Sequence, residues 1–175
     1  MFSGTLVLGL YLCSQRTMIS VLELTPATRF PHNYAGGSHK SERHFLDFLI
    51  DGQSLWEKLG KPEMVSVLCR EYATEETVRA INRLLLAEGA DFPNERRSLF
   101  ICAECAELGC GAITAIVWKE GETVTWEDFG YENTYEENVR RDEYAAVGPF
   151  TFNAVSYERT LEEAWHRLTP ERRLE

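Results

Sequence analysis

Residues 98–129 read SLFICAECAELGCGAITAIVWKEGETVTWEDF, with apolar segments on both sides of a group of cysteines. This stretch begins with an apolar run at 98–102, which predicts a strand that leads directly into the cysteines. Residues 112–119 and 122–129 are rich in β-branched and aromatic residues, and a short glycine-containing turn joins them, which is typical of a β-hairpin. The stretch therefore predicts three successive strands, with a cysteine-rich loop between the first and the second.

Two longer helices are expected, one before this stretch and one after it. The first extends from Thr74, a candidate N-cap, to a stop at Gly89. Its apolar positions recur at helical spacing and are Val78, Ile81, Leu84 and Leu85. The second is capped by Asn153 and ends before Pro170, and its apolar positions are Tyr157, Leu161, Ala164, Trp165 and Leu168. We expect both apolar faces to pack on the sheet.

The segments before the first of these helices are shorter. Residues 19–24 alternate between apolar and polar and predict a strand that ends at Thr25-Pro26. Residues 26–44 are expected to be irregular. Ser54 is expected to cap a short helix, and Pro62 to begin another one.

The composition is that of a globular protein with a substantial core, because 44% of the 175 residues are hydrophobic and 26% are charged. Together with the expected elements, it predicts the α+β class. We expect a single domain over residues 18–175, with an antiparallel sheet of four to six strands and two longer helices. The formal net charge of −10 repels phosphate groups, so no binding to nucleic acid is expected.

Residues 1–17, MFSGTLVLGLYLCSQRT, are expected to be an N-terminal extension outside the core. The apolar run 6–13 is too short to span a bilayer, so no membrane association is expected. No Lys or Arg precedes the run, which disfavours a secretory signal, and a first strand of the fold is the main alternative. Five cysteines, three of them within nine residues, do not form a typical secreted disulfide framework, so we expect a cytoplasmic protein.

The chemistry is concentrated in the C-x2-C-x4-C pattern of Cys102, Cys105 and Cys110. Two cysteines three residues apart at a tight turn can direct both sulfurs at one zinc ion, so a zinc site is one hypothesis. A tetrahedral zinc ion needs a fourth ligand. The candidates for that ligand are Cys69, His32, His39, His44 and Glu104.

Two other interpretations of the cysteines stay open. Cys102 and Cys105 are also the minimal dithiol for a reversible disulfide, which would make the protein a thiol-dependent oxidoreductase. Glu104 and Glu107, beside the sulfurs in the sequence, disfavour a reactive thiolate. Alternatively, the cysteines fill a buried turn as small apolar side chains. The sequence therefore favours a binding or interaction protein with a structural cysteine cluster over an enzyme.

Residues 120–143 hold nine carboxylates against two arginines. A solvated charged face is the simplest interpretation. The functional hypothesis is a docking surface for a basic protein partner, as in an immunity-type or inhibitor protein, because aromatic residues among the acidic ones can anchor an interface. These candidate anchors are Trp126, Phe129, Tyr131 and Tyr135.

The runs 100–112 (FICAECAELGCGA) and 126–133 (WEDFGYEN) resemble a family of small, uncharacterised bacterial proteins with a CxxCxxxxCG segment. Two further stretches match, 30–34 (FPHNY) and 148–152 (GPFTF), so that the resemblance covers roughly residues 18–160. Some members are labelled oxidoreductase, a label that fits a dithiol but identifies no substrate and assigns no catalytic residue. No nucleotide-binding fingerprint accompanies it, so no nicotinamide or flavin cofactor is expected.

Overall fold

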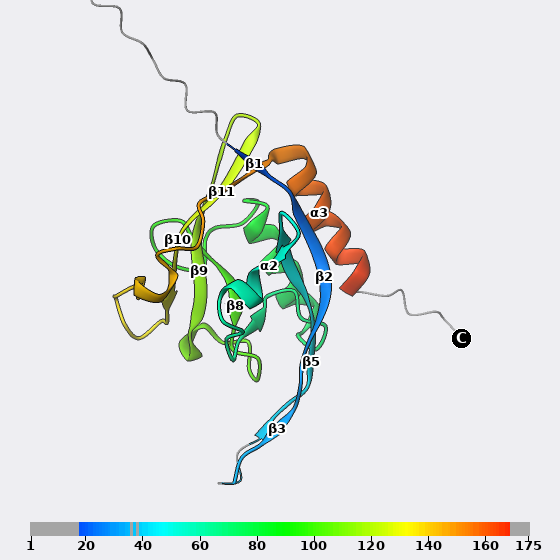
Figure 1. The fold of residues 1–175 in the computed structure, drawn as a ribbon, viewed down its shortest axis with the longest axis vertical. Coiled ribbons are helices and arrows are strands. Elements are labelled where there is room, and N and C mark those ends of the chain that lie inside the picture. The colour runs from blue at the N-terminus through cyan, green and yellow to red at the C-terminus, as the bar shows by residue number, and fades with distance from the viewer. Residues whose placement is uncertain (1–17, 36, 38, 169–175) are drawn as a thin grey trace, which may run out of the picture.

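Six strands form one curled sheet in the computed structural model, which describes residues 18–35, 37 and 39–168 (Figure 1). In order across the sheet they are β1 (Ile19–Ser20), β11 (Phe150–Asn153), β10 (Thr123–Glu132), β9 (Ala112–Glu120), β8 (Arg96–Ile101) and β7 (Val65–Ser66). All neighbours are antiparallel except β1 and β11, which are parallel. The predicted mixture of helices with a sheet of up to six strands is confirmed, with one parallel pair added.

β9 and β10 form the predicted hairpin, with Gly121 at a φ of 55° in the turn. Trp126 of β10 lies opposite Val117 of β9, and both side chains are buried. The register shifts after Glu127, which indicates a β-bulge, and β10 then continues to Glu132, beyond the predicted strand. Because Glu132 pairs with the first residue of β9, the end of β10 lies beside the cysteine-containing loop.

A second sheet contains β2 (Leu22–Arg29), β5 (Arg43–Ile50) and β6 (Gln53–Ser54). The prediction that Thr25-Pro26 ends the first strand is wrong, because Pro26 lies within β2 and pairs with Leu46. β2 is at the edge of this sheet, where a residue whose N–H would not be needed for pairing can be a proline.

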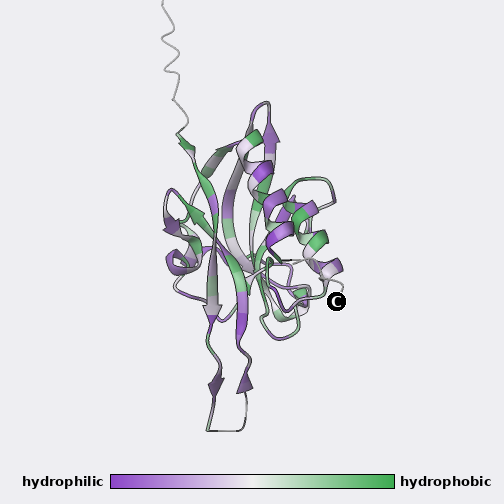
Figure 2. Ribbon diagram, turned by 90° about the vertical axis from the view of Figure 1, so that its right-hand side faces the viewer, coloured by the Kyte–Doolittle hydropathy of each residue, from purple (hydrophilic) through white to green (hydrophobic). Residues whose placement is uncertain are grey.

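The irregular segment predicted at 26–44 is a hairpin arm instead. β2 and β5 continue into β3 (His32–Asn33) and β4 (His39–Lys40), which extend away from the rest of the fold (Figures 1 and 2). We call residues 30–42 the arm. Its sequence is polar and rich in glycine and histidine, so the local pattern predicts no strand there, although His32 and Asn33 pair with Lys40 and His39 across the arm.

α2 (Thr74–Leu84) is the first of the two longer helices, and it differs from the prediction at both ends. Ala73 is its N-cap, and Thr74 is its first helical residue. Leu86 takes a left-handed φ of 62°, so the helix ends before Gly89 is reached. The predicted apolar face is confirmed at Ile81 and Leu84, which are buried, while Val78 and Leu85 are half-buried.

α3 (Ala154–Leu168) is the second longer helix, and it packs beside β2 and α2 (Figure 1). The Asn153 side chain accepts a hydrogen bond from the backbone N–H three residues later, at 3.1 Å, which confirms the predicted cap. Ser54 likewise caps the short helix α1 (Leu55–Lys58). The helix predicted to begin at Pro62 does not form, because the chain enters β7 there. None of the helices in the described ranges is long and apolar enough to cross a membrane.

One buried apolar cluster joins both sheets and both longer helices, and Trp126 lies within it. Its ring packs edge-on against Phe48 of β5 and Phe152 of β11, with centroid distances of 5.2 and 5.3 Å. Its Nε1 donates to the hydroxyl of Tyr157, and that hydroxyl donates to the backbone oxygen of Leu84. This chain of hydrogen bonds ties β10 to α3 and α2. Residues 1–17, predicted as an extension, lie outside the described residues.

Candidate functional site

Cys102, Cys105 and Cys110 come together in the loop between β8 and β9. Their three Sγ atoms all lie within 4.8 Å of one another, and the Cys105 and Cys110 sulfurs are 3.4 Å apart. Cys102 is half-buried, whereas the other two are exposed, and all three are free thiols. The predicted clustering of the C-x2-C-x4-C cysteines is therefore confirmed, but the picture of three cysteines filling a buried turn is not.

Two tight turns produce this convergence. Ala106, at a φ of 59°, donates its N–H to the backbone oxygen of Cys102 at 3.0 Å, which folds the chain back after the first cysteine. The 3-10 turn Leu108–Cys110 is closed by the N–H of Cys110, which donates to Glu107. Gly111 then redirects the chain into β9 at a φ of 103°, which side chains rarely adopt.

Two tyrosines lie against the glycines of this loop. A Cβ atom at Gly111 would collide with the ring of Tyr131, and one at Gly109 would lie 3.0 Å from the ring of Tyr135. The Tyr131 hydroxyl also lies 3.5 Å from the backbone oxygen of Cys110. The glycines are therefore needed for the close approach of the two rings, and the tyrosines form one wall of the cysteine loop.

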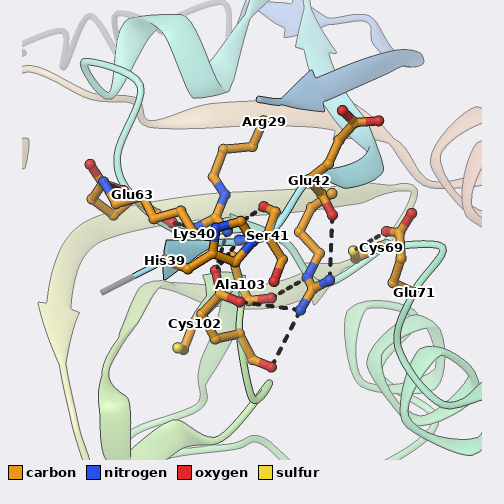
Figure 3. Close-up of polar contacts among 12 residues, drawn as sticks. Arg29, His39, Lys40, Ser41, Glu42, Glu63, Cys69, Glu71, Cys102 and Ala103 are labelled. Carbon is orange, nitrogen blue, oxygen red and sulfur yellow. Dashed lines mark hydrogen bonds and ion pairs between the residues drawn. The ribbon is translucent and has the colours of Figure 1, made fainter. Parts of the chain in front are cut away.

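The residues between Cys102 and Cys105 are held by the arm and by the ends of β2 and β5 from which it extends (Figure 3). The Glu104 carboxylate accepts hydrogen bonds from the guanidinium of Arg29 and from the backbone N–H of Ser41. Arg43 donates to the backbone oxygen of Ala103 and forms an ion pair with Glu104 at 3.4 Å. The hydroxyl of Tyr72 donates to the backbone oxygen of Cys102 at 2.9 Å. These contacts thus fix the first half of the loop, whereas the two tyrosines lie against its second half, around Cys110.

These contacts correct the role expected of Glu104. Partial burial raises its pKa, but the hydrogen bonds from Arg29 and Ser41 outweigh burial and lower the pKa to about 2. The negative charge of Glu104 is therefore paired with Arg29 and Ser41 and is not free to oppose a thiolate. Glu104 is also not part of the three-cysteine group.

The other candidates for a fourth ligand are also engaged elsewhere. Cys69 is buried and donates to the Glu71 carboxylate, and burial raises its pKa to about 12. His44 also contacts Glu71, at 2.8 Å. His39 contacts the side chain of Asn33, and the ring of His32 packs edge-on against Tyr34. Within residues 18–35, 37 and 39–168, the group therefore contains three ligands only.

The backbone of the loop favours negative charge on one sulfur. Partial burial raises the pKa of Cys102, but the backbone N–H groups of Cys105 and Glu104 donate to its sulfur, and the net result is a lowered pKa. For Cys105, burial and the neighbouring thiols of Cys110 and Cys102 raise the pKa to about 11, against a hydrogen bond from the N–H of Glu107. Of these two cysteines, Cys102 therefore has the lower pKa.

The four predicted aromatic anchors divide into two pairs. Trp126 and Phe129 are fully buried in the core, so the anchoring role expected of them is corrected to a packing role. Tyr131 is half-buried, and Tyr135 is 85% exposed. A docking role for a basic partner stays a prediction for these two alone.

The acidic segment is partly neutralised within the protein. The buried Arg96 guanidinium binds Glu132 and Asp128, each at 2.7 Å, and Asp128 also pairs with Arg141. These three pairings use two of the nine carboxylates counted in the sequence. The face offered to a basic partner is therefore less acidic than the sequence alone implies.

Sequence reasoning missed the supports of the loop. Arg29 and Arg43 belong to strands about sixty or more residues before the cysteines, and only the fold brings them together with Ala103 and Glu104. The paired glycines around Cys110 were a usable signal for the tyrosine wall, because small residues on both sides of a cysteine indicate that something packs closely there.

Comparison with protein-family models, with curated proteins and with solved structures found no match for this chain. The function is therefore inferred from the geometry of the cysteine group.

Proposed function

We propose that the protein is a binding protein that holds a zinc ion at Cys102, Cys105 and Cys110. The convergence of three sulfurs within 4.8 Å is the observation that carries the proposal. Zinc–thiolate bonds of about 2.3 Å in a tetrahedron place sulfurs about 3.8 Å apart, so small side-chain rotations of the three cysteines suffice to bind the ion.

The surroundings of the sulfurs also suit a zinc–thiolate centre. Three thiolates around one Zn²⁺ carry a net negative charge, which hydrogen bonds from backbone N–H groups offset. The N–H groups of Glu104 and Cys105 donate to the Cys102 sulfur, and that of Glu107 donates to the Cys105 sulfur. At Cys102 the backbone of the loop thus favours the deprotonated sulfur, which is the form that binds the metal.

The zinc content of the natively purified full chain tests this proposal. We expect close to one zinc per chain by elemental mass spectrometry, and loss of the metal together with a lower melting temperature in Cys105→Ser, since metal affinity contributes to folding stability at such sites. Cys13→Ser, which lies outside the described residues, is the matched control and should retain the zinc. Protein that is fully folded, reduced and free of zinc, and that takes up none on titration, would contradict the proposal.

Thiol chemistry is the second candidate function, and the lowered pKa of Cys102 is the observation that favours it. In the metal-free protein, alkylation by iodoacetamide should label Cys102 at a lower pH than Cys105, whose pKa is raised to about 11. Peptide mapping of the labelled sites over a pH series measures this order. Turnover of a disulfide substrate by the zinc-free protein would favour the oxidoreductase hypothesis over zinc binding.

A further inference from the structure

We propose that Cys105 and Cys110 are an oxidative modification site, at which hydrogen peroxide forms a disulfide that expels the metal. This inference rests on the proposed function for its zinc-releasing part, whereas the disulfide itself depends only on the geometry of the two thiols. It names a different pair from the C-x-x-C dithiol that the sequence suggests.

Distance and access single out this pair. The Sγ atoms of Cys105 and Cys110 are 3.4 Å apart, against about 2.05 Å in a disulfide, so bonding needs an approach of little more than an ångström. Both residues are exposed, so peroxide and solvent reach them. Cys102 differs, because it is half-buried and its loop is held by Arg43 and Tyr72.

The segment between the two cysteines can accommodate the approach. Cys110 is the last residue of a 3-10 turn and lies between Gly109 and Gly111, which have no side chains of their own to restrict the backbone, and the rings of Tyr131 and Tyr135 that pack on these glycines come from outside the turn. On the other side, Cys105 follows Glu104, which is fixed by the arm. Movement of the Cys110 turn towards Cys105 therefore forms the bond without disturbing the anchored half of the loop.

The reaction balances with hydrogen peroxide as the oxidant. One thiolate attacks the peroxide, the O–O bond breaks, and a sulfenic acid and a hydroxide form. The second thiolate then attacks the sulfenic sulfur, the S–S bond forms, and a second hydroxide leaves. Two electrons pass from the sulfur pair to the peroxide, and solvent protons convert both hydroxides to water. With zinc bound, two of its three thiolate ligands are consumed, so the ion is released.

Peptide mapping of the full chain tests the pairing directly. Cleavage after glutamate separates the three cysteines, because Glu104 precedes Cys105 and Glu107 lies between Cys105 and Cys110. After treatment with a small excess of peroxide, we expect the tripeptide 105–107 to be linked to the fragment 108–120, and zinc to appear in solution in proportion to this link. Dithiothreitol should reverse both changes.

Variants give the controls. Cys102→Ser should still form the link after removal of metal, whereas Cys105→Ser and Cys110→Ser should not. A link between 105–107 and the fragment that contains Cys102, or no link in metal-free wild-type protein, would overturn the proposal. A correct link in protein that never held zinc would leave the modification site standing and refute the proposed zinc binding. Bound zinc with no link between the two fragments after oxidation would support the proposed zinc binding and refute the modification site.

Discussion

The buried hydroxyl of Tyr157 shows how one atom connects three elements. It accepts a hydrogen bond from Trp126 Nε1 at 3.1 Å and donates to the backbone oxygen of Leu84 at 2.8 Å. Burial raises the pKa of this tyrosine far above its usual value, so the hydroxyl stays protonated at any physiological pH and remains a donor. Trp126, which the sequence predicts as a surface anchor, therefore belongs to the centre of the core.

Replacing Tyr157 with Phe should reduce the free energy of unfolding by about 1–3 kcal/mol, because a buried donor and a buried acceptor lose their partner. Urea denaturation followed by tryptophan fluorescence measures the change. Tyr135→Phe is the matched control, since that side chain is 85% exposed, and it should leave stability unchanged. Equal effects of the two substitutions would contradict the hydrogen-bond chain.

The helix α2 packs on the core through its buried face. Leu84 is fully buried within the apolar cluster, in the last turn of the helix. Leu84→Ala should cost about 2–5 kcal/mol in the free energy of unfolding, by lost burial and the cavity that remains. Val155→Ala, on the exposed side of α3, should cost far less. A cost near zero for Leu84→Ala would mean that another face of α2 is buried.

The contact between the arm and the cysteine loop makes a prediction about acid stability. Glu104 has a pKa of about 2 in the folded protein, below the ordinary value of 4.5. A lowered folded-state pKa stabilises the fold above the unfolded-state pKa, and this contribution is lost as the pH falls from about 4.5 towards 2. Glu104→Gln should therefore be less stable than wild type at pH 6, and the difference should shrink as the pH falls.

Urea denaturation at a series of pH values between 6 and 3 measures this effect. Glu76→Gln, in the exposed first turn of α2, is a suitable control with the same chemical change. A stability difference for Glu104→Gln that does not vary with pH would show that the carboxylate charge is not used by Arg29 and Ser41.

The local sequence pattern predicts some of the secondary-structure elements correctly, but not all of them. The hairpin of β9 and β10 could be predicted because both strands and their turn are adjacent in sequence. The strand β7 could not, since its two residues are held by pairing with β8, some thirty-five residues later. Likewise, proline at position 26 ends a strand by local rules, but pairing with β5 continues the strand through it.

At the scale of the whole molecule, distant segments meet at the cysteine loop. The loop between β8 and β9 presents the three sulfurs, Tyr131 at the end of β10 and Tyr135 just after it lie against that loop, and Arg29 and Ser41 hold Glu104. The three cysteines could be predicted to cluster because they are close in sequence. Their supports could not, because each comes from an element whose position depends on the completed fold.

X-ray absorption at the zinc edge of the natively purified protein identifies the atoms around the zinc ion that we propose the three thiolates hold. The predicted result is a zinc shell of three sulfur atoms at about 2.3 Å and one lighter atom at about 2.0–2.1 Å. Cys105→Ser should lower the sulfur count or remove the metal altogether. A zinc shell made of nitrogen and oxygen atoms alone, or no zinc edge in folded and reduced protein, would show that the three thiolates do not hold zinc.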